Sequence, residues 1–432
     1  MVLLEVNLCQ DKIFNLSKIK PMDGTFKNNF DIPIHSWYPY IEGFSINFVK
    51  SILDNYDTNI TVYDPFNGSG TTTLTASSLG IKSFASEINP IMRFIAYTKI
   101  NTVKHILDSN KIVDLKKTYN KIKKELYVGS SNNKNIEIKN IINDCYLSKD
   151  FFEAHTLNKI AFVKYVIKSI KDEDFKNIGL LALASIIVEL SNMIRAADLR
   201  KKTSKEKMNS SNDVITLYIN KLSKIISDIE IMQSVNFEEM TFISDNAKKL
   251  NKNYCNSIDL IITSPPYVNG TNYFRNTKLE LWILDYIKKE TDLKFLREQA
   301  ITAGINNVSI NNIVEYIDYV EPYAIQLDKI SPDRRIPKMI RAYFSDMNIV
   351  FNNFYYLLKE NGSIYFDIGD SEYYGVRIPV DDLIVQIARE NGFILVNDKI
   401  LRKRHSKTGK TLSQKLLIFN KMGQNAKFIN KK

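Results

Sequence analysis

Cysteine and histidine are scarce in this sequence, and neither is grouped. The three cysteines lie far apart along the 432 residues, without the spacing of a disulfide framework or of a zinc site. The four histidines form no ligand pair either. An isolated cysteine usually behaves as a small buried hydrophobic residue. We therefore expect no bound metal, and we expect buried roles for Cys9, Cys145 and Cys255.

Long apolar runs are also missing. No stretch approaches the roughly 18–20 uninterrupted apolar residues that a membrane-spanning helix requires. The first residues, MVLLEVNLCQDKIF, have too short an apolar part and reach an acidic residue too soon for a secretory signal. These absences predict a cytoplasmic protein that does not bind a membrane.

Positive charge is in excess. The chain has 59 Lys and Arg against 48 Asp and Glu, a formal net charge of +11. Such an excess raises the local concentration of a polyanion such as nucleic acid. A chain rich in lysine and asparagine can also be basic through the base composition of its genome, so the charge agrees with a nucleic-acid partner without deciding it. The length allows a full α/β core with a second, smaller domain.

Short apolar segments that end in turn residues predict a parallel sheet. The segment Asn59–Pro65 reads as a strand, a helix follows over Thr71–Leu79 with Gly80 as its stop, and Lys82–Pro90 reads as a second strand. This order is typical of the first half of a doubly wound, dinucleotide-type fold. Five further strands are predicted at Glu239–Asp245, Ser257–Tyr267, Asn361–Ser371, Gly392–Leu401 and Ser413–Lys421.

Helical patterns interrupt this alternation twice. We interpret residues 101–235 as an inserted helical subdomain and residues 285–340 as a second insertion, which is partly helical. The predicted catalytic domain then comprises residues 1–100, 236–284 and 341–432. Between its last two strands, Arg402–Lys410 reads as a basic loop.

The segment VYDPFNGSGTTT (Val62–Thr73) joins a strand to a helix through a glycine-rich loop. A phosphate-binding Walker loop would need a lysine after its glycines, and none is present, so binding of a nucleoside triphosphate is disfavoured. Gly68 and Gly70 allow a tight turn and a close approach to a ligand. Thr71 or Thr72 can cap the helix, whose N-terminal amides suit a carboxylate. The loop therefore favours a ligand that carries an amino acid.

Acidic residues follow three of the predicted strands. Asp64 could pair with a ligand ammonium group, Glu87 could accept from both ribose hydroxyls, and Asp245 could accept from an adenine amine. Any one of them could instead be a solvated or helix-capping charge. Three acids at successive strand ends around one glycine loop make that alternative weaker. Phe66 of the same loop completes the candidate cofactor contacts.

The motif TSPPY (Thr263–Tyr267) ends a predicted strand. Its two prolines, Pro265 and Pro266, hold the backbone extended and fix the direction of the Pro265 carbonyl. Together with the Ser264 hydroxyl, this carbonyl could accept hydrogen bonds from both N–H groups of an exocyclic base amine and leave its lone pair free to attack a methyl group. Tyr267 could stack on a base rotated out of a duplex. The alternative is an ordinary proline-rich turn at a strand end.

With these motifs the chain resembles the bacterial amino-group DNA methyltransferases, which modify cytosine at N4 or adenine at N6. The resemblance implies S-adenosyl-L-methionine as cofactor, double-stranded DNA as substrate, a flipped-out target base, and a Rossmann-like class I fold with a mainly parallel seven-stranded sheet and helical insertions. A cognate restriction endonuclease is a candidate partner in the bacterial cytoplasm. The motifs that carry the resemblance are DPFNGSGTT, SEINP and TSPPY, with similar later blocks at Tyr273–Leu284 and Tyr343–Ser371 and a looser match at HSWYPY.

Within that family a serine at the first position of the tetrapeptide, here SPPY (Ser264–Tyr267), points to cytosine N4. Site-specific N4-cytosine methylation is therefore the favoured expectation. Adenine N6, an RNA amine and a non-catalytic DNA-binding relative are the alternatives. The chain departs from the family in the place of its large insertion, so either insertion could read the DNA. Candidate DNA-binding residues are Arg200, Lys201 and Lys202 in the basic segment Ile194–Lys207, Arg334 and Arg335 in the second insertion, and Arg275 after the catalytic motif.

Overall fold

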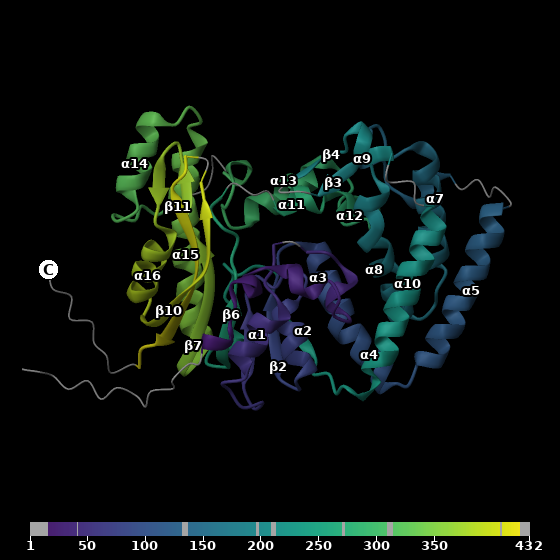
Figure 1. The fold of residues 1–432 in the computed structure, drawn as a ribbon, viewed down its shortest axis with the longest axis horizontal. Coiled ribbons are helices and arrows are strands. Elements are labelled where there is room, and N and C mark those ends of the chain that lie inside the picture. The colour runs from purple at the N-terminus through teal and green to yellow at the C-terminus, as the bar shows by residue number, and fades with distance from the viewer. Residues whose placement is uncertain are drawn as a thin grey trace, which may run out of the picture.

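The centre of the molecule is a seven-stranded sheet with the order β10-β11-β7-β6-β1-β2-β5 (Figure 1). The computed structural model describes residues 16–423 except 41, 132–136, 196–197, 209–212, 270–272, 309–313 and 407. The strands of this sheet are β1 (Thr61–Asp64), β2 (Lys82–Ser86), β5 (Met240–Ser244), β6 (Ile258–Thr263), β7 (Leu358–Gly369), β10 (Phe393–His405) and β11 (Thr411–Lys421).

Six of the seven strands of this sheet run in the same direction, and β11 runs opposite to them. β1 pairs in parallel with β2 and β6, β2 with β5, and β6 with β7, whereas β11 is antiparallel to both β7 and β10. The chain is thus α/β with a mainly parallel, Rossmann-like sheet, and the predicted fold class is confirmed.

Alternate residues of the central strands pack on opposite faces of the sheet, as the two-residue repeat of a strand requires. Val62 and Leu260 lie in a buried cluster with Phe48 of α1 (Ile46–Leu53). Their sequence neighbours Tyr63 and Ile261 lie in a second cluster, on the other face. Because both faces are covered, β6 is buried over nearly its whole length.

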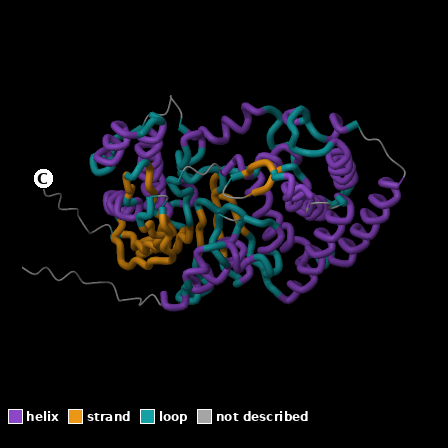
Figure 2. The backbone as a smooth tube through the Cα atoms, turned by 45° about the horizontal axis from the view of Figure 1, so that its top comes forward, coloured by secondary structure: helices purple, strands orange, loops and turns teal. Residues whose placement is uncertain are grey.

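Helices flank the sheet on both sides (Figure 2). In Figure 1, α14 (Glu321–Ile330), α15 (Arg335–Leu357) and α16 (Val380–Glu390) lie to the left of the central strands, and the helices of residues 101–235 lie to the right. After the glycine loop come α2 (Thr71–Ser78) and α3 (Pro90–Tyr97), and after the TSPPY motif come α11 (Tyr273–Asn276), α12 (Lys278–Ile283) and α13 (Glu290–Gln299).

The described part of residues 101–235 is mainly helical and includes one short hairpin. Its buried residues, such as Ile160, Leu183 and Ile219, form one continuous apolar cluster with Leu74 of α2 and Trp282 of α12. A π-helical turn (Thr98–Thr102) leads into it from α3. Its elements are α4 (Val103–Asp108), α5 (Ile112–Ser131), α6 (Ile138–Ile141), α7 (Ala154–Lys168), α8 (Glu173–Leu190), β3 (Met193–Arg195), β4 (Leu199–Lys201), α9 (Ser204–Met208) and α10 (Val214–Ile231).

The basic segment between the last two strands differs from the prediction. Residues 402–405 belong to β10, so the prediction of a loop over Arg402–Lys410 is wrong for its first four residues. Backbone pairing continues through Arg404 opposite Leu412 and His405 opposite Thr411. The residue pattern did not indicate a strand here, because the residues of an edge strand can be charged throughout and then lack the apolar alternation of a strand. A second short hairpin, β8 (Ser371–Tyr373) and β9 (Val376–Ile378), follows β7.

No helix in the described part of the chain is long and apolar enough to cross a membrane. Within the same residues, no cluster of three or more His, Cys, Asp or Glu side chains is arranged to hold a metal ion.

Candidate active site

A cleft with a cavity volume of about 340 Å³ opens at the carboxyl ends of the parallel strands. Ligands of open α/β sheets bind at this edge. The two sequence motifs meet there, although almost two hundred residues separate them along the chain. From the motifs, the cleft is lined by Asp64, Pro65, Phe66, Asn67, Ser69, Thr71, Glu87, Ile88, Asn89, Ser264, Pro265, Pro266 and Tyr267.

The glycine loop is shaped by two left-handed residues. Gly68 has φ of +49° and Gly70 has φ of +88°, values that residues with a side chain rarely adopt. A Cβ atom on Gly68 would stand 2.8 Å from the ring of Tyr40, which also lines the cleft. Helix α2 then begins at Thr71. The glycines themselves do not line the cleft, but they place Asn67, Ser69 and the first turn of α2 against it.

Glu87 is held by main-chain amides. Its Oε2 atom accepts from the N–H of Gly68 at 2.7 Å, and its Oε1 atom accepts from the N–H of Asn89 at 2.8 Å. Burial raises the pKa of this carboxyl to about 7, and the hydrogen bonds from the two main-chain N–H groups oppose that shift. A carboxylate has about four acceptor positions, so each oxygen of Glu87 keeps capacity for a ligand hydroxyl.

Asp64 connects the cofactor motif to the catalytic motif. Its buried carboxylate accepts from the hydroxyl of Thr263 at 2.7 Å and from the N–H of Phe66 at 3.0 Å. Burial raises its pKa to about 6. The ends of β1 and β6 are therefore fixed relative to each other by a side-chain bond as well as by the sheet.

Ser264 and Tyr267 lie close together within the TSPPY turn. The Ser264 hydroxyl donates to the Tyr267 hydroxyl at 3.4 Å, and the N–H of Tyr267 donates to the hydroxyl of Tyr273 at 3.2 Å. The Tyr267 ring packs on the backbone of β7, because a Cβ atom on Gly369 would stand 3.2 Å from its Cε2 atom. Burial raises the pKa of Tyr267 well above its usual value.

Asp367, near the end of β7, is a buried acid of the cleft that sequence analysis missed. Both of its carboxylate oxygens accept from the Gln414 side-chain amide at 2.9 Å. Burial raises its pKa to about 7, and hydrogen bonds from Gln414, Tyr267 and Ser264 oppose the shift. The signal that could have found it is the one used for Asp64, an acid at the carboxyl end of a predicted strand.

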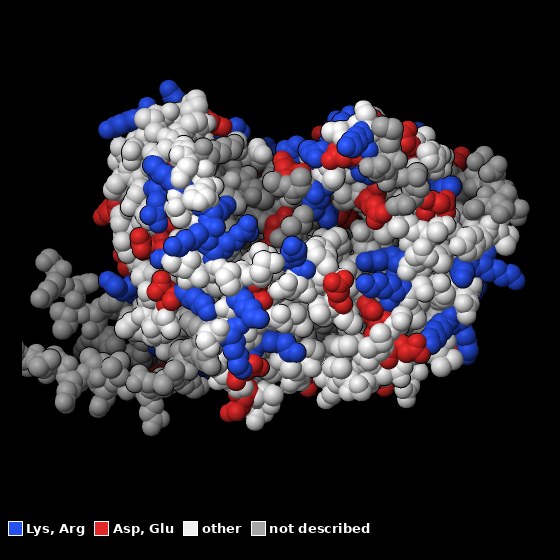
Figure 3. Space-filling model, viewed as in Figure 1, with Lys and Arg blue, Asp and Glu red and all other residues white. Residues whose placement is uncertain are grey.

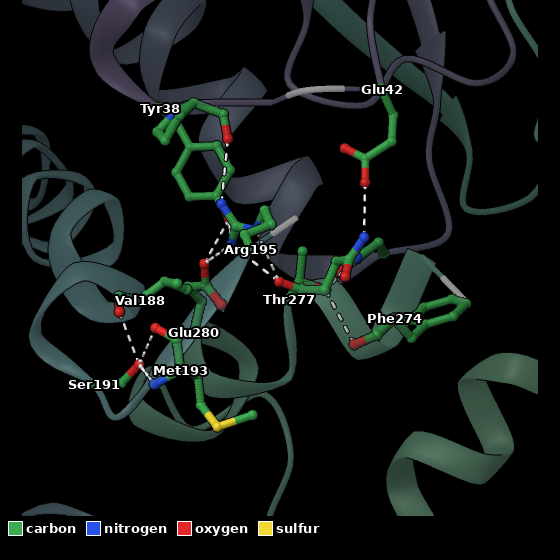
Figure 4. Close-up of polar contacts among 12 residues, drawn as sticks. Tyr38, Glu42, Val188, Ser191, Met193, Arg195, Phe274, Thr277 and Glu280 are labelled. Atoms are coloured by element: carbon green, nitrogen blue, oxygen red, sulfur yellow. Dashed lines mark hydrogen bonds and ion pairs between the residues drawn. The ribbon is translucent and has the colours of Figure 1, made fainter. Parts of the chain in front are cut away.

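A polar network around Arg195 forms another wall of the cleft (Figure 4). Its guanidinium pairs with Glu280 of α12 and donates to the carbonyl of Asn276 at 3.0 Å and to the hydroxyl of Tyr38 at 3.2 Å. The Tyr38 hydroxyl in turn donates to Glu280 at 2.7 Å, and the Asn276 side chain donates to Glu42 at 2.9 Å. Sequence analysis had included this arginine in a basic loop, but its side chain points into the protein.

Asp245 is placed differently from the other predicted acids. Its carboxylate is half exposed and pairs with Lys249 at 3.1 Å. The residues that line the cleft at the end of β5 are its neighbours, Asn246 and Ala247.

The predicted DNA-binding cations lie outside the cleft lining, and most are paired within the protein. Arg275 pairs with Asp198 at 2.8 Å, and Arg334 is an exposed residue at the start of α15. The lining instead contains Arg402 and Arg404 of β10. The remaining partners are Glu206 for Arg200 at 2.9 Å, Asp150 for Lys201 at 3.1 Å, the Glu189 carbonyl for Lys202 at 2.7 Å and Asp333 for Arg335 at 2.7 Å.

The chain is similar in sequence to Type II methyltransferases. It is 25% identical to M.BsoBI of Geobacillus stearothermophilus over 445 residues, which cover 90% of this chain and 84% of the relative. It is 25% identical to M.AvaI of a Nostoc species, with 85% and 81% covered. It is 20% identical to M.MvaI of Kocuria varians, with 76% and 74% covered. No family profile matches the sequence.

Two solved structures show a weak overall likeness to this chain. A SAM-dependent methyltransferase from Methanosarcina mazei aligns with a TM-score of 0.30 and 8% identity, covering 86% of this chain and 97% of that one. The rRNA methyltransferase aviRa from Streptomyces viridochromogenes aligns with a TM-score of 0.26 and 8% identity, covering 88% and 86%. These scores are too low to support an argument about function.

Proposed function

We propose that this protein is a site-specific DNA methyltransferase that transfers the methyl group of S-adenosylmethionine to the N4 amine of a flipped-out cytosine. The observation that carries the proposal is the meeting of two motifs in one cleft, with the glycine loop and Glu87 beside Ser264–Tyr267. The similarity to Type II methyltransferases supports the class of reaction.

The residues around the glycine loop fit S-adenosylmethionine, which supplies a reactive sulfonium methyl group when bound. Glu87 keeps acceptor positions for two ribose hydroxyls, because its amide partners occupy one position on each oxygen. The first amides of α2 and the buried carboxylate of Asp64 suit the carboxylate and ammonium of an amino acid. Tyr40 and Phe66 add aromatic walls.

Ser264 and Pro265 would receive the target amine. The Ser264 hydroxyl has two lone pairs, so it can accept from the amine whichever neighbour, Tyr267 or Asp367, receives its own proton. The Pro265 carbonyl offers a second acceptor whose direction is fixed by the proline backbone. Two acceptors on one amine draw the nitrogen out of conjugation with the ring and aim its lone pair at the methyl carbon.

Asp367 would take the proton that the reaction releases. Transfer of the methyl group would form a nitrogen–carbon bond, break the sulfur–methyl bond with its electron pair left on sulfur, and leave the amine nitrogen positively charged until it loses one N–H proton. The Ser264 hydroxyl can pass this proton to the Asp367 carboxylate, to which it is hydrogen-bonded. A pKa near 7 suits a group that must accept a proton and release it again near neutral pH.

The serine at the start of the tetrapeptide favours cytosine, and adenine N6 is the alternative. For reading the DNA sequence, residues 101–235 and 285–340 are the candidate elements. The helices of the first segment lie to the right of the central strands, whereas the second segment includes α13, near those helices, and α14, to the left (Figure 1).

The proposal is tested by incubating the purified protein with unmethylated bacterial DNA and methyl-labelled S-adenosylmethionine, followed by digestion to nucleosides and mass spectrometry. We expect label in N4-methylcytosine, and none with the Ser264→Ala variant above a small residual rate. Label in N6-methyladenine would keep the chemistry and correct the base. Absence of label from DNA, with bound S-adenosylmethionine shown by calorimetry, would overturn DNA methylation.

A further inference from the structure

Two arginines of the edge strand β10 line the cleft on the side away from the glycine loop. Arg402 and Arg404 are two residues apart, so they project from the same face of the strand. Arg402 pairs across the ladder with Gln414, whose side chain reaches into the cleft to Asp367. This register orients the Arg402 side chain towards the cleft.

The strand order gives the distance of these arginines from the catalytic motif. Ser264 follows β6, Asp367 lies on β7, Gln414 on β11 and Arg402 on β10, which are consecutive neighbours in the sheet. Three strand spacings amount to about 14 Å. At about 3.4 Å of rise per phosphate, one strand of a duplex passes several phosphates over that length. Arg402 and Arg404 would therefore lie next to the target base, outside the part of the cleft that receives it.

The charge of Arg402 is not used within the described protein. The Arg402 side chain is exposed and has no hydrogen bond or ion pair with another described residue. This contrasts with Arg200, Lys201, Arg275 and Arg335, each of which already has an acidic partner. Figure 3 shows Lys and Arg side chains gathered over the region of β10 and β11, next to the hollow between the two sides of the molecule.

The hairpin that carries these arginines is held rigidly. Arg404 donates to the main-chain carbonyl of Asp370 at 2.7 Å, just beyond the end of β7. The buried Asp370 carboxylate is bound by Arg377 at 2.6 Å and by the hydroxyl of Ser413 at 3.2 Å. A guanidinium held in place loses less conformational freedom when it binds a partner than one on a mobile loop does.

We propose that Arg402 and Arg404 bind backbone phosphates of the target strand beside the flipped nucleotide. The inference rests on the proposed DNA substrate and names where its backbone is held. The Arg402 guanidinium, which has no protein partner among the described residues, can form a bidentate pair with a phosphate. Arg404 donates one N–H to the Asp370 carbonyl and keeps its other donors for a phosphate. Each phosphate contact releases condensed cations from the DNA. These contacts position the DNA and do not read its sequence.

The test compares variants of the full chain that each lose one positive charge from the same strand. Arg402→Gln removes the cleft-facing cation. Lys403→Gln removes its exposed neighbour, which alternates to the opposite face and also has no partner among the described residues. Affinity for a short unmethylated duplex of mixed sequence is measured by fluorescence anisotropy over a series of salt concentrations.

For Arg402→Gln we expect the slope of log affinity against log salt to fall by about 1, with roughly threefold to tenfold weaker binding at low salt. Lys403→Gln should keep the wild-type slope. Arg404→Gln should change the slope in the same direction as Arg402→Gln. Melting temperatures of all three variants control for misfolding.

Equal slopes for Arg402→Gln and Lys403→Gln would overturn the inference. If the wild-type protein methylates DNA while these slopes are equal, only the phosphate contact fails. If no methyl group reaches DNA, the proposed function fails whatever the slopes are.

Discussion

Arg195 and Glu280 form an ion pair that is almost completely buried, with side-chain exposures of 10% and 1%. The arginine belongs to β3, within the helical segment, and the glutamate belongs to α12, after the catalytic motif. A second buried bond from Tyr38 reaches the same carboxylate. Three segments distant in sequence are therefore tied together behind one wall of the cleft.

Removing one partner of this pair should be costly. Arg195→Ala leaves a buried carboxylate without its cation, and we expect a loss of about 3–5 kcal/mol in the free energy of unfolding, measured by denaturant titration. Arg200→Ala, which breaks an exposed pair with Glu206, should cost about 1 kcal/mol or less. Similar losses in the two variants would show that the buried pair does not hold the wall.

Glu87→Gln should weaken S-adenosylmethionine binding. The new amide turns an N–H donor towards one of the two main-chain N–H groups that now face the carboxylate. Hydrogen bonds to charged groups contribute about 1.5–3 kcal/mol, so we expect about 10- to 100-fold weaker binding by calorimetry. Asp245→Asn is the control and should bind as the wild type does, because its carboxylate pairs with Lys249 outside the cleft lining. The reverse result would restore Asp245 as a cofactor contact and exclude Glu87.

Tyr267→Ala should reduce methyl transfer far more than duplex binding. The ring lies against Gly369 and lines the cleft, where in the proposed function it stacks on a flipped base. Base–aromatic stacking contributes about 1–3 kcal/mol, so kcat/KM should fall by about 10- to 100-fold while duplex affinity changes little. Tyr267→Phe keeps the stacking face and should keep most of the activity. Equal losses of transfer and of duplex affinity in Tyr267→Ala would contradict a stacking role.

The reaction should require the ionised form of Asp367. With a pKa near 7, this acid is increasingly protonated as the pH falls below neutrality, so kcat should decline on the acidic side of pH 7. Asp367→Asn should lower kcat by about 10²- to 10⁴-fold and flatten the acidic limb of the profile. An acidic limb that persists unchanged in Asp367→Asn would assign the titration to another group.

The same acid should make stability depend on pH. Its pKa is raised from 3.8 to about 7 on folding by burial, so the folded chain holds a proton that the unfolded chain releases above about pH 4. The resulting stabilisation is full below pH 4 and is lost as the pH rises to about 7, to a maximum of about 4 kcal/mol. Asp367→Asn should therefore melt at a higher temperature than the wild type at pH 8, and its melting temperature should vary less between pH 5 and 8. Identical pH dependence in the two proteins would show that Asp367 is not the buried acid responsible.

The sequence predicts the sheet well, because its strands are apolar runs and those that lead to the cleft are followed closely by Pro or Asp. All seven predicted strands exist and overlap those of the structure. Boundaries are less accurate where burial changes along an element. Helix α15 begins at Arg335, whereas the apolar pattern by itself predicts a helix only over Met347–Lys359. Its N-terminal half also has buried residues, which pack against elements that no local pattern identifies.

Only part of the candidate site could be predicted from the sequence. Glu87 and Ser264 belong to motifs whose local geometry is set by neighbouring glycine or proline residues, so both could be predicted to face one cleft. Asp367, Arg195 and Arg402 reach the same cleft through strand neighbours that are distant along the chain. Single cations were the least predictable, because whether a lysine or arginine is free depends on acids brought close by folding.

The apolar cluster that runs from α2 through the helices of residues 101–235 to Trp282 bears on how such enzymes could be re-engineered. A DNA-recognition domain can be exchanged between relatives only if it has a hydrophobic core of its own. In this protein, replacing the helical segment would expose Leu74 and Trp282, and it would remove Arg195, the cation that pairs with Glu280. If this segment is the one that reads DNA, new specificity is more readily obtained by substituting its solvent-facing residues, with the interior left intact.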